Sequence, residues 1–400
     1  MKKIPLYSLA TACLIVSAAP ATSWAEDAAP PAPPVLQPTM IGPLTANPNP
    51  YNIDSGILGK VYFSGVLSGL GQVQNHSQSN STFGDRSNLT DISNAQVIAQ
   101  TTEGYVQFYM QAGAYSMPSL GTPYIRSSKA VDNFYGPIPV AYVKLAPTDA
   151  LSLQVGKLPT LIGAEYTFSF QNPNIERGLL WNQESAISRG AQLNYTVGPL
   201  AMSLAGTDGF YSGQYSWITG SATYTFNEHN SATFVGGGNT RTSTKSTAAT
   251  PVLQNNGEVY NVIYTYTNAP WTIIPYVQAT HVPKSATIGA NSDATTYGGA
   301  LTVNYSFDQS TALAGVSLPV RFEYISSSGS AAAGSPNLLY GPGSKAWSLT
   351  VTPTYQNNFY FVRGEFSYVG AQSITNGAGL GLNGNDKSQS RGLIEAGVRF

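Results

Sequence analysis

A two-residue alternation of apolar and polar side chains runs through almost the whole of this 400-residue chain. In 191–197 and in 301–307, Ala, Leu, Val, Tyr or Phe occupies every second position, and Gln, Asn, Thr or Ser occupies the positions between them. Successive side chains of a β-strand point to opposite faces, so each such segment is predicted to form a strand with one apolar and one polar face. A soluble antiparallel sandwich and a transmembrane β-barrel both show this pattern.

The low content of charged residues favours the barrel. Asp, Glu, Lys and Arg make up 10% of the chain, against roughly 25% in typical soluble domains. A sandwich exposes its polar faces to water, whereas a barrel turns an apolar face to lipid and a polar face to its lumen. We therefore predict an all-β fold, a transmembrane antiparallel β-barrel in an outer membrane of the Gram-negative type.

Turn signals predict the number of strands. Short segments rich in Gly, Pro, Asn or Asp are typical of tight turns, and they lie at 101–104, 146–149, 198–199, 227–230, 267–270, 308–311 and 356–358. Longer connections alternate with them, at 69–92, 116–138, 158–188, 207–215, 239–256, 282–295, 327–344 and 370–388. With a first strand near 58–68 and a last strand near 391–400, we expect about 16 strands, to within two, because closure requires an even number.

Charged and aromatic residues follow the predicted faces. A Lys or Arg that faces lipid at mid-depth costs about 2–4 kcal/mol. Charged residues accordingly fall in the inward register: Lys60, Lys144, Arg321, Glu323, Arg363, Glu365, Glu395 and Arg399. Outward aromatic residues lie beside the short turns, as expected of an interfacial girdle: Tyr195, Phe226, Tyr266, Trp271, Phe307, Tyr355 and Tyr360.

The N-terminus predicts export. Lys2 and Lys3 precede an apolar run at 9–19, and the small residues Ser23 and Ala25 suit cleavage after Ala25. The apolar run is shorter than the ~20 residues that a spanning helix needs. We interpret this region as a secretory signal peptide.

These features divide the chain into three parts. We expect a signal peptide at 1–25, a Pro-rich periplasmic linker at 26–56 and the barrel at 57–400. The only cysteine, Cys13, lies in the predicted signal peptide. The mature chain is therefore expected to have neither a disulfide nor a thiolate metal site.

A set of short motifs carries a family resemblance. GKLPTLIGAE, NPNIERGLLW, SRGAQLNYTVGPL and DGFYSG lie within 156–213, and QFYMQAGAYSMPSLG lies at 107–121. Together they resemble the OmpL-like family of outer-membrane β-barrel porins. The resemblance is strongest over 100–215. It implies a passive aqueous diffusion channel for small polar solutes, surrounded by outer-membrane lipid, and analogy with porins suggests a homo-oligomer, in particular a trimer.

The last strand alternates up to a terminal phenylalanine. Ile394, Ala396, Val398 and Phe400 occupy one face. A final strand that ends in Phe resembles the C-terminal signal of outer-membrane proteins. The resemblance implies that the barrel-assembly machinery is a partner that recognises Phe400.

The connection at 158–188 is the candidate functional segment, because it carries more Leu, Phe and Trp than a solvated loop needs. These side chains are buried if the loop folds into the lumen or against a neighbouring subunit, and the lumen of a large barrel is otherwise open. We expect an inward-folding loop that forms a pore constriction. Its candidate residues are Glu165, Glu176, Arg177, Glu184 and Arg189, and the candidate wall residues are Lys144, Arg321, Glu323, Arg363 and Glu365.

Two roles are open for these charged residues. Rings of charge in a pore select solutes by sign and size. Alternatively, the charges pair with one another and hold the loop, which leaves the pore weakly selective. Both roles are compatible with the sequence.

Signals for other functions are weak. His76, His229 and His281 are scattered and lie in no nucleophile motif, so we expect no catalytic residue, metal site or cofactor. The formal net charge is −1 and the sequence has no basic patch, so we expect no binding to nucleic acid. The alternative function is an adhesin or surface-interaction barrel that acts through the Ser/Thr/Asn-rich loops 75–94 and 239–256.

Overall fold

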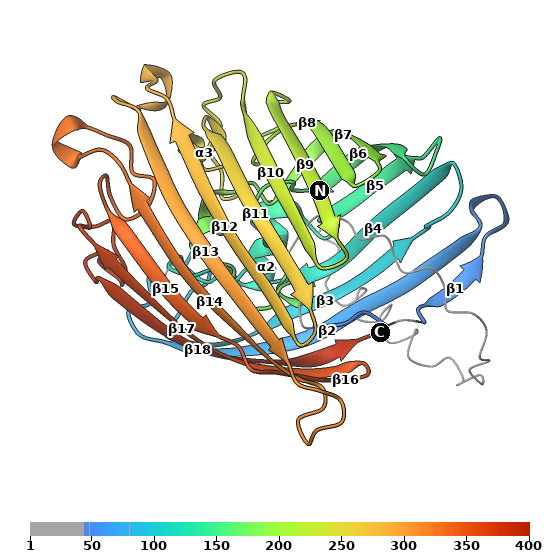
Figure 1. The fold of residues 1–400 in the computed structure, drawn as a ribbon. Helices are drawn as coiled ribbons and strands as arrows, with labels where there is room; N and C mark the ends of the chain where they lie inside the picture. The colour runs from blue at the N-terminus through green and yellow to red at the C-terminus, as the bar shows by residue number, and fades with distance from the viewer. Residues whose placement is uncertain (1–43, 48, 80) are drawn as a thin grey trace, which may run out of the picture. The chain divides into compact units, whose positions relative to one another are not determined.

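The computed structural model describes residues 44–47, 49–79 and 81–400, which form an antiparallel β-barrel (Figure 1). The predicted signal peptide and most of the predicted linker lie outside the described residues. The strands are β1 (Tyr51–Asp54), β2 (Lys60–Gln74), β3 (Asn88–Gln100), β4 (Val106–Tyr115), β5 (Val140–Leu145), β6 (Leu151–Pro159), β7 (Ile187–Val197), β8 (Leu200–Thr207), β9 (Trp217–Asn227), β10 (Asn230–Asn239), β11 (Glu258–Asn268), β12 (Trp271–Val282), β13 (Ala294–Ser306), β14 (Val316–Ser327), β15 (Lys345–Val351), β16 (Thr354–Asn357), β17 (Tyr360–Gln372) and β18 (Ser388–Arg399).

Helical structure in the described residues is confined to short pieces. These are α2 (Ser127–Ala130), α3 (Val252–Asn255) and single turns at Gly56–Leu58, Val131–Tyr135, Ser169–Gln171, Leu180–Gln183, Ala286–Ile288 and Ala331–Ala333. Among the described residues, no helix is long and apolar enough to cross a membrane.

Pairing between the first and last long strands closes the barrel. β18 pairs with β2, and Ile394 lies opposite Gly71. β15 and β16 are two parts of one strand, since both pair with β14 and with β17, and Pro353 between them has no N–H for the ladder. β1 is a short additional strand on β2, within the range expected as linker. The closed barrel thus has 16 strands, which confirms the prediction.

Two connections differ in length from the sequence prediction. β2 extends to Gln74 and β3 begins at Asn88, so the loop between them is 75–87 and the predicted boundary 69–92 is wrong. Gly69 and Gly71, within the range predicted as a loop, are both paired in the ladder with β3. The ladder uses only backbone groups, so glycine lowers strand propensity without ending the strand. The turn between β13 and β14 is also longer than predicted, at 307–315.

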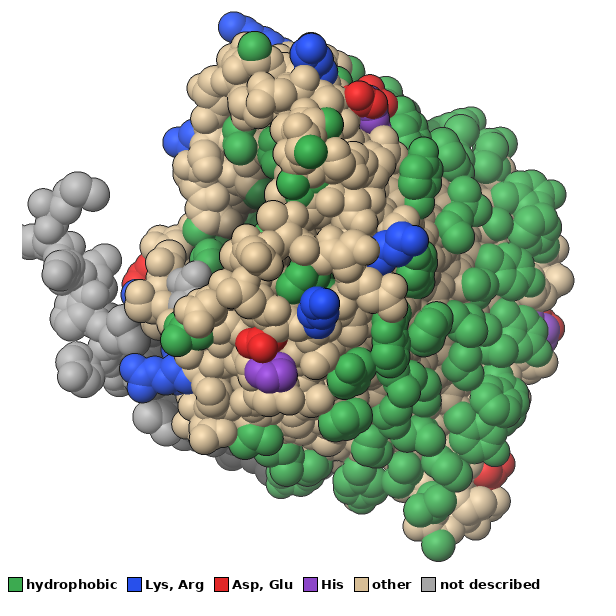
Figure 2. Space-filling view, turned by 90° about the vertical axis from the view of Figure 1, so that its left-hand side faces the viewer, with side chains coloured by type: hydrophobic (Ala, Val, Ile, Leu, Met, Phe, Trp, Pro, Cys, Tyr) green, Lys and Arg blue, Asp and Glu red, His purple; other side chains and the backbone are tan. Residues whose placement is uncertain are grey.

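The outer face of the wall is apolar. Large side chains of the outward register, such as Val262, Val277 and Phe322, are exposed. Figure 2 shows hydrophobic side chains gathered over one side of the view and mainly polar groups over the rest. Trp271 and Tyr305 meet beside a short turn, with ring centroids 4.7 Å apart. An apolar band bordered by aromatic rings suits a lipid environment.

Candidate functional site

Residues 160–186, here called the inner segment, connect β6 to β7 and pack against the inside of the wall. The Thr160 N–H donates to the Ala186 carbonyl at 3.0 Å, which joins the two ends of the segment. The large apolar side chains of the segment are buried: Phe168, Phe170, Leu179, Leu180 and Trp181. Burial of such side chains against the wall holds the segment within the barrel, as the sequence predicted.

Arg321 of β14 makes the first polar attachment to the wall. Its Nη1 lies 2.5 Å from Glu165 Oε1 and donates to the Glu176 carbonyl at 2.9 Å. Its Nε lies 3.3 Å from Glu323 Oε2, which also accepts the Leu179 N–H at 3.0 Å. The side chains of Arg321, Glu165 and Glu323 are at most 1% exposed. Removing one partner of such a buried pair typically costs about 3–5 kcal/mol.

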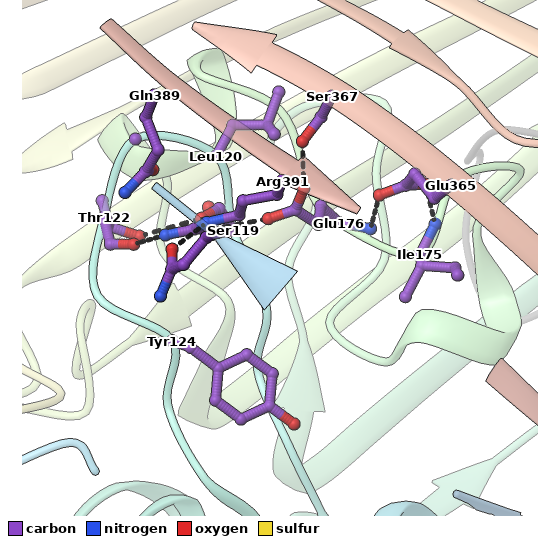
Figure 3. Close-up of polar contacts among 12 residues, drawn as sticks. Ser119, Leu120, Thr122, Tyr124, Ile175, Glu176, Glu365, Ser367, Gln389 and Arg391 are labelled. Carbon is purple, nitrogen blue, oxygen red and sulfur yellow. Dashed lines mark hydrogen bonds and ion pairs between the residues drawn. The ribbon is translucent and has the colours of Figure 1, made fainter. Parts of the chain in front are cut away.

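Arg391 of β18 makes the second attachment (Figure 3). Its Nη1 lies 2.6 Å from Glu176 Oε1 and donates to the Ser119 carbonyl at 2.7 Å, and its Nη2 donates to the Thr122 carbonyl. Beside it, Glu365 of β17 accepts the backbone N–H of Glu176 at 3.0 Å. This arginine therefore joins the inner segment, the 116–139 loop and the wall.

Arg363 of β17 makes the third attachment. It pairs with Glu395 of β18 and donates from Nη1 to the Asn172 carbonyl at 3.1 Å. Glu395 Oε1 accepts a hydrogen bond from the Ser169 hydroxyl at 3.2 Å. Guanidinium groups from three wall strands thus converge on one segment of the chain.

Arg177 and Glu184 differ from these pairs. Both side chains are buried, and neither the Arg177 guanidinium nor the Glu184 carboxyl has a hydrogen-bond partner among the described residues. The Arg177 guanidinium lies 5.9 Å from the Trp181 ring centroid, and burial lowers its pKa to about 10. Burial raises the pKa of the Glu184 carboxyl well above its usual value, and the carboxylates of Glu165 and Glu323 raise it further.

Residues 60–400 match the model of the family described as "Putative beta-barrel porin-2, OmpL-like". The chain belongs to this family of porins. No curated protein sequence matches it.

Solved structures of outer-membrane channels share the fold. They include the anion-selective porin from Comamonas acidovorans (TM-score 0.55, 11% identity) and OmpT of Vibrio cholerae in its trimer form (0.54, 12%). Another is the outer membrane channel DcaP of Acinetobacter baumannii (0.54, 12%). Each alignment covers 85% of this chain and at least 97% of the other. As a member of the porin family matched above, the chain is an outer-membrane porin with a passive channel function.

Two predicted site residues of the porin lie apart from these attachments. Lys144 of β5 is half-buried and lies opposite Gln107 and Gln154, in the inward register. Arg189 lies on the other face of β7 from Gln192, pairs with Asp208 at 2.7 Å and lies 4.0 Å from the Tyr211 ring centroid.

Arg391 is the wall residue that the sequence analysis missed. It lies four residues before Glu395, and β-strand alternation places both on the same face. The signal was therefore present in the inward register of the last strand. In the part of the chain that the structure describes, no group of three or more His, Cys, Asp or Glu side chains is placed to hold a metal ion.

Proposed function

We propose that the inner segment is the constriction of this passive channel for small polar solutes. The observation that carries the proposal is the convergence of Arg321, Arg363 and Arg391, from three wall strands, on one inward-folded segment. A barrel of this size otherwise encloses a wide aqueous lumen. A segment held across the lumen reduces the width available to solutes.

Within this proposal the charged residues have two roles. Glu165 and Glu176, with Glu323, Glu365 and Arg363 on the wall, hold the segment, since each is engaged in the attachments described above. Neither the Arg177 guanidinium nor the Glu184 carboxyl has a hydrogen-bond partner among the described residues. The Arg177 charge is therefore available to shape the field in the lumen, whereas Glu184, whose pKa is raised, contributes a charge only when it is ionised. Lys144, in the inward register of β5, contributes from the wall, whereas Arg189 lies on the other face of β7 and is paired with Asp208.

We also propose a homo-oligomer in outer-membrane lipid. OmpT of Vibrio cholerae shares the fold and is described in a trimer form, which supports a trimer here. The Phe400 N–H donates to the Gly65 carbonyl at 3.0 Å, and the Gly65 N–H donates to the Phe400 carbonyl at 2.7 Å. The terminal phenylalanine thus lies at the seam that closes the barrel, where the assembly machinery would act.

Planar-bilayer recording tests the constriction. We expect stable ohmic steps from the wild type, and a several-fold larger single-channel conductance when a short Gly-Ser linker replaces 164–182. A matched control shortens the exposed 307–315 turn and should leave conductance unchanged. Equal conductance of the wild type and the 164–182 variant, with both correctly folded, would contradict the proposal.

A further inference from the structure

Several lumen-facing residues on one side of the barrel are apolar. Ala205, Val235 and Val259 fall in the inward register, and Ala205 and Val235 lie opposite the inward polar residues Gln192 and Asn261. The three are buried, at 4%, 0% and 2% exposed. A water-filled lumen favours polar side chains at such positions. These apolar, buried side chains therefore need an apolar partner inside the barrel.

The beginning of the inner segment supplies that partner. Leu161 and Ile162 are buried and belong to one apolar cluster with the three wall residues, Phe210 and Trp217. Gly163 follows with φ +78°, a conformation that favours glycine. Its N–H donates to Asn261 Oδ1 at 3.2 Å, a single polar contact beside the apolar ones.

A small cavity lies between this cluster and the wall. Its volume is about 20 Å³, which is room for roughly one water molecule. The residues around it carry no ionisable side chain, and its polar lining includes Thr160, Ser185, Gln192 and Thr219. The cavity is therefore a narrow, uncharged gap between the inner segment and strands β7–β9.

The two sides of the inner segment differ in what holds them. Toward β14, β17 and β18, displacement separates buried ion pairs made by Arg321, Arg363 and Arg391. Toward β8–β11, displacement of Leu161 and Ile162 separates apolar contacts. Displacement toward the lumen would leave buried charges without partners only on the first side. The free-energy cost of displacement is therefore much higher there.

We infer that ions and solutes cross on the β8–β11 side, through a hydrophobic gate formed by Leu161 and Ile162 against Ala205, Val235 and Val259. This inference rests on the proposed role of the inner segment as the constriction. A hydrophobic constriction excludes water and ions until it widens. Because the aperture is lined by apolar side chains, it selects solutes by size and ease of dehydration, and the buried ion pairs of Arg321, Arg363 and Arg391 lie on the opposite side.

Cysteine modification during channel recording tests the position of the gate. The sequence contains only Cys13, in the predicted signal peptide, so single cysteines can be introduced one at a time. We would record Ile162→Cys and Val235→Cys while adding a charged, water-soluble methanethiosulfonate. Ile175→Cys is the matched control, because Ile175 is equally buried in the same segment but packs with Leu70 and Leu393.

The expected result is a stepwise fall in conductance for the two gate variants and no change for Ile175→Cys. Conducting channels in which both gate cysteines are inert, or in which Ile175→Cys responds equally, would overturn the gate. A wild type without any conductance would instead refute the channel proposal on which the gate depends.

Gate polarity provides a second measurement. Ile162→Ser should raise single-channel conductance or open probability about twofold, because a hydroxyl group allows the gap to hydrate. Ile175→Ser controls for general loosening of the segment, and heat-modifiable migration on gels confirms that both variants fold. An equal increase for the two serine variants would contradict a localised gate.

Discussion

The two sides of the inner segment contact the barrel wall with opposite chemistry. Toward β14, β17 and β18 the contacts are buried charge pairs and hydrogen bonds, centred on Arg321, Arg363 and Arg391. Toward β8–β11 the contacts are mainly apolar, through Leu161 and Ile162. Charge pairs demand one geometry, whereas apolar contacts are non-directional and tolerate displacement. The inner segment is therefore fixed on the side of β14, β17 and β18 and can be displaced more easily on the side of β8–β11.

Removing a charge from the fixed side should have the largest effect. Arg321→Ala leaves Glu165 and Glu323 without their guanidinium partner, so we expect a loss of about 3–5 kcal/mol in the free energy of unfolding. Urea unfolding of the folded barrel, followed by tryptophan fluorescence, measures it. Arg241→Ala, at an exposed arginine, is the control. Equal midpoints for the two variants would show that Arg321 does not hold the segment.

Truncating the apolar side should cost less stability. Leu161→Ala is expected to lower the free energy of unfolding by about 2 kcal/mol, at the low end for a buried leucine, because the segment can shift into the adjacent gap. The single-channel conductance of Leu161→Ala should nevertheless be higher than that of the wild type. If Leu161→Ala lost as much stability as Arg321→Ala and its conductance were unchanged, the apolar side would be as fixed as the charged side, and the comparison would be wrong.

The pH dependence of stability tests Glu184. Its folded pKa is raised by burial and by Glu165 and Glu323, so the folded state holds this proton more tightly than the unfolded chain. Its contribution is therefore most favourable below the unfolded pKa and is lost as pH rises toward the folded pKa. Glu184→Gln should exceed the wild type in stability at pH 8, with a gap that narrows toward pH 4. If the stability difference between Glu184→Gln and the wild type instead widened toward acid pH, the folded pKa of Glu184 would be lowered and the prediction would be wrong.

The smallest effect is expected at the wall residue Lys144. Lys144→Gln removes a half-buried lumen charge that lies apart from the buried ion pairs, so stability should change by less than about 1 kcal/mol. Ion selectivity should move slightly toward cations, seen as a shift in reversal potential across a KCl gradient. Lys345→Gln, at an exposed lysine, is the control. A shift as large as that of a charge variant in the inner segment would place the aperture near β5.

Most of the wall could be predicted from the sequence. Strand alternation and tight-turn composition are local properties, so they locate strands without knowledge of their partners. The exception is the connection predicted at 69–92, where β2 extends to Gln74 because its backbone pairs with β3, a partner that local composition does not reveal.

Most charged residues of the site were predicted from the sequence, but the pairs that they form were not. Arg321 and Glu165 are 156 residues apart, and Arg391 and Glu176 are 215 apart. No periodicity links positions so distant. The role of these residues in selecting solutes stays a prediction that the recordings above can test.

The sequence by itself determined a lipid-facing barrel of about 16 strands with a long apolar connection after the fifth, because alternation and charge placement can be recognised in each strand separately. Only the tertiary structure decided where that connection lies. Its position depends on the sum of contacts with wall residues far away in the chain: arginines on one side, and Val235 and Val259 on the other. Such contacts exist only once the barrel has closed.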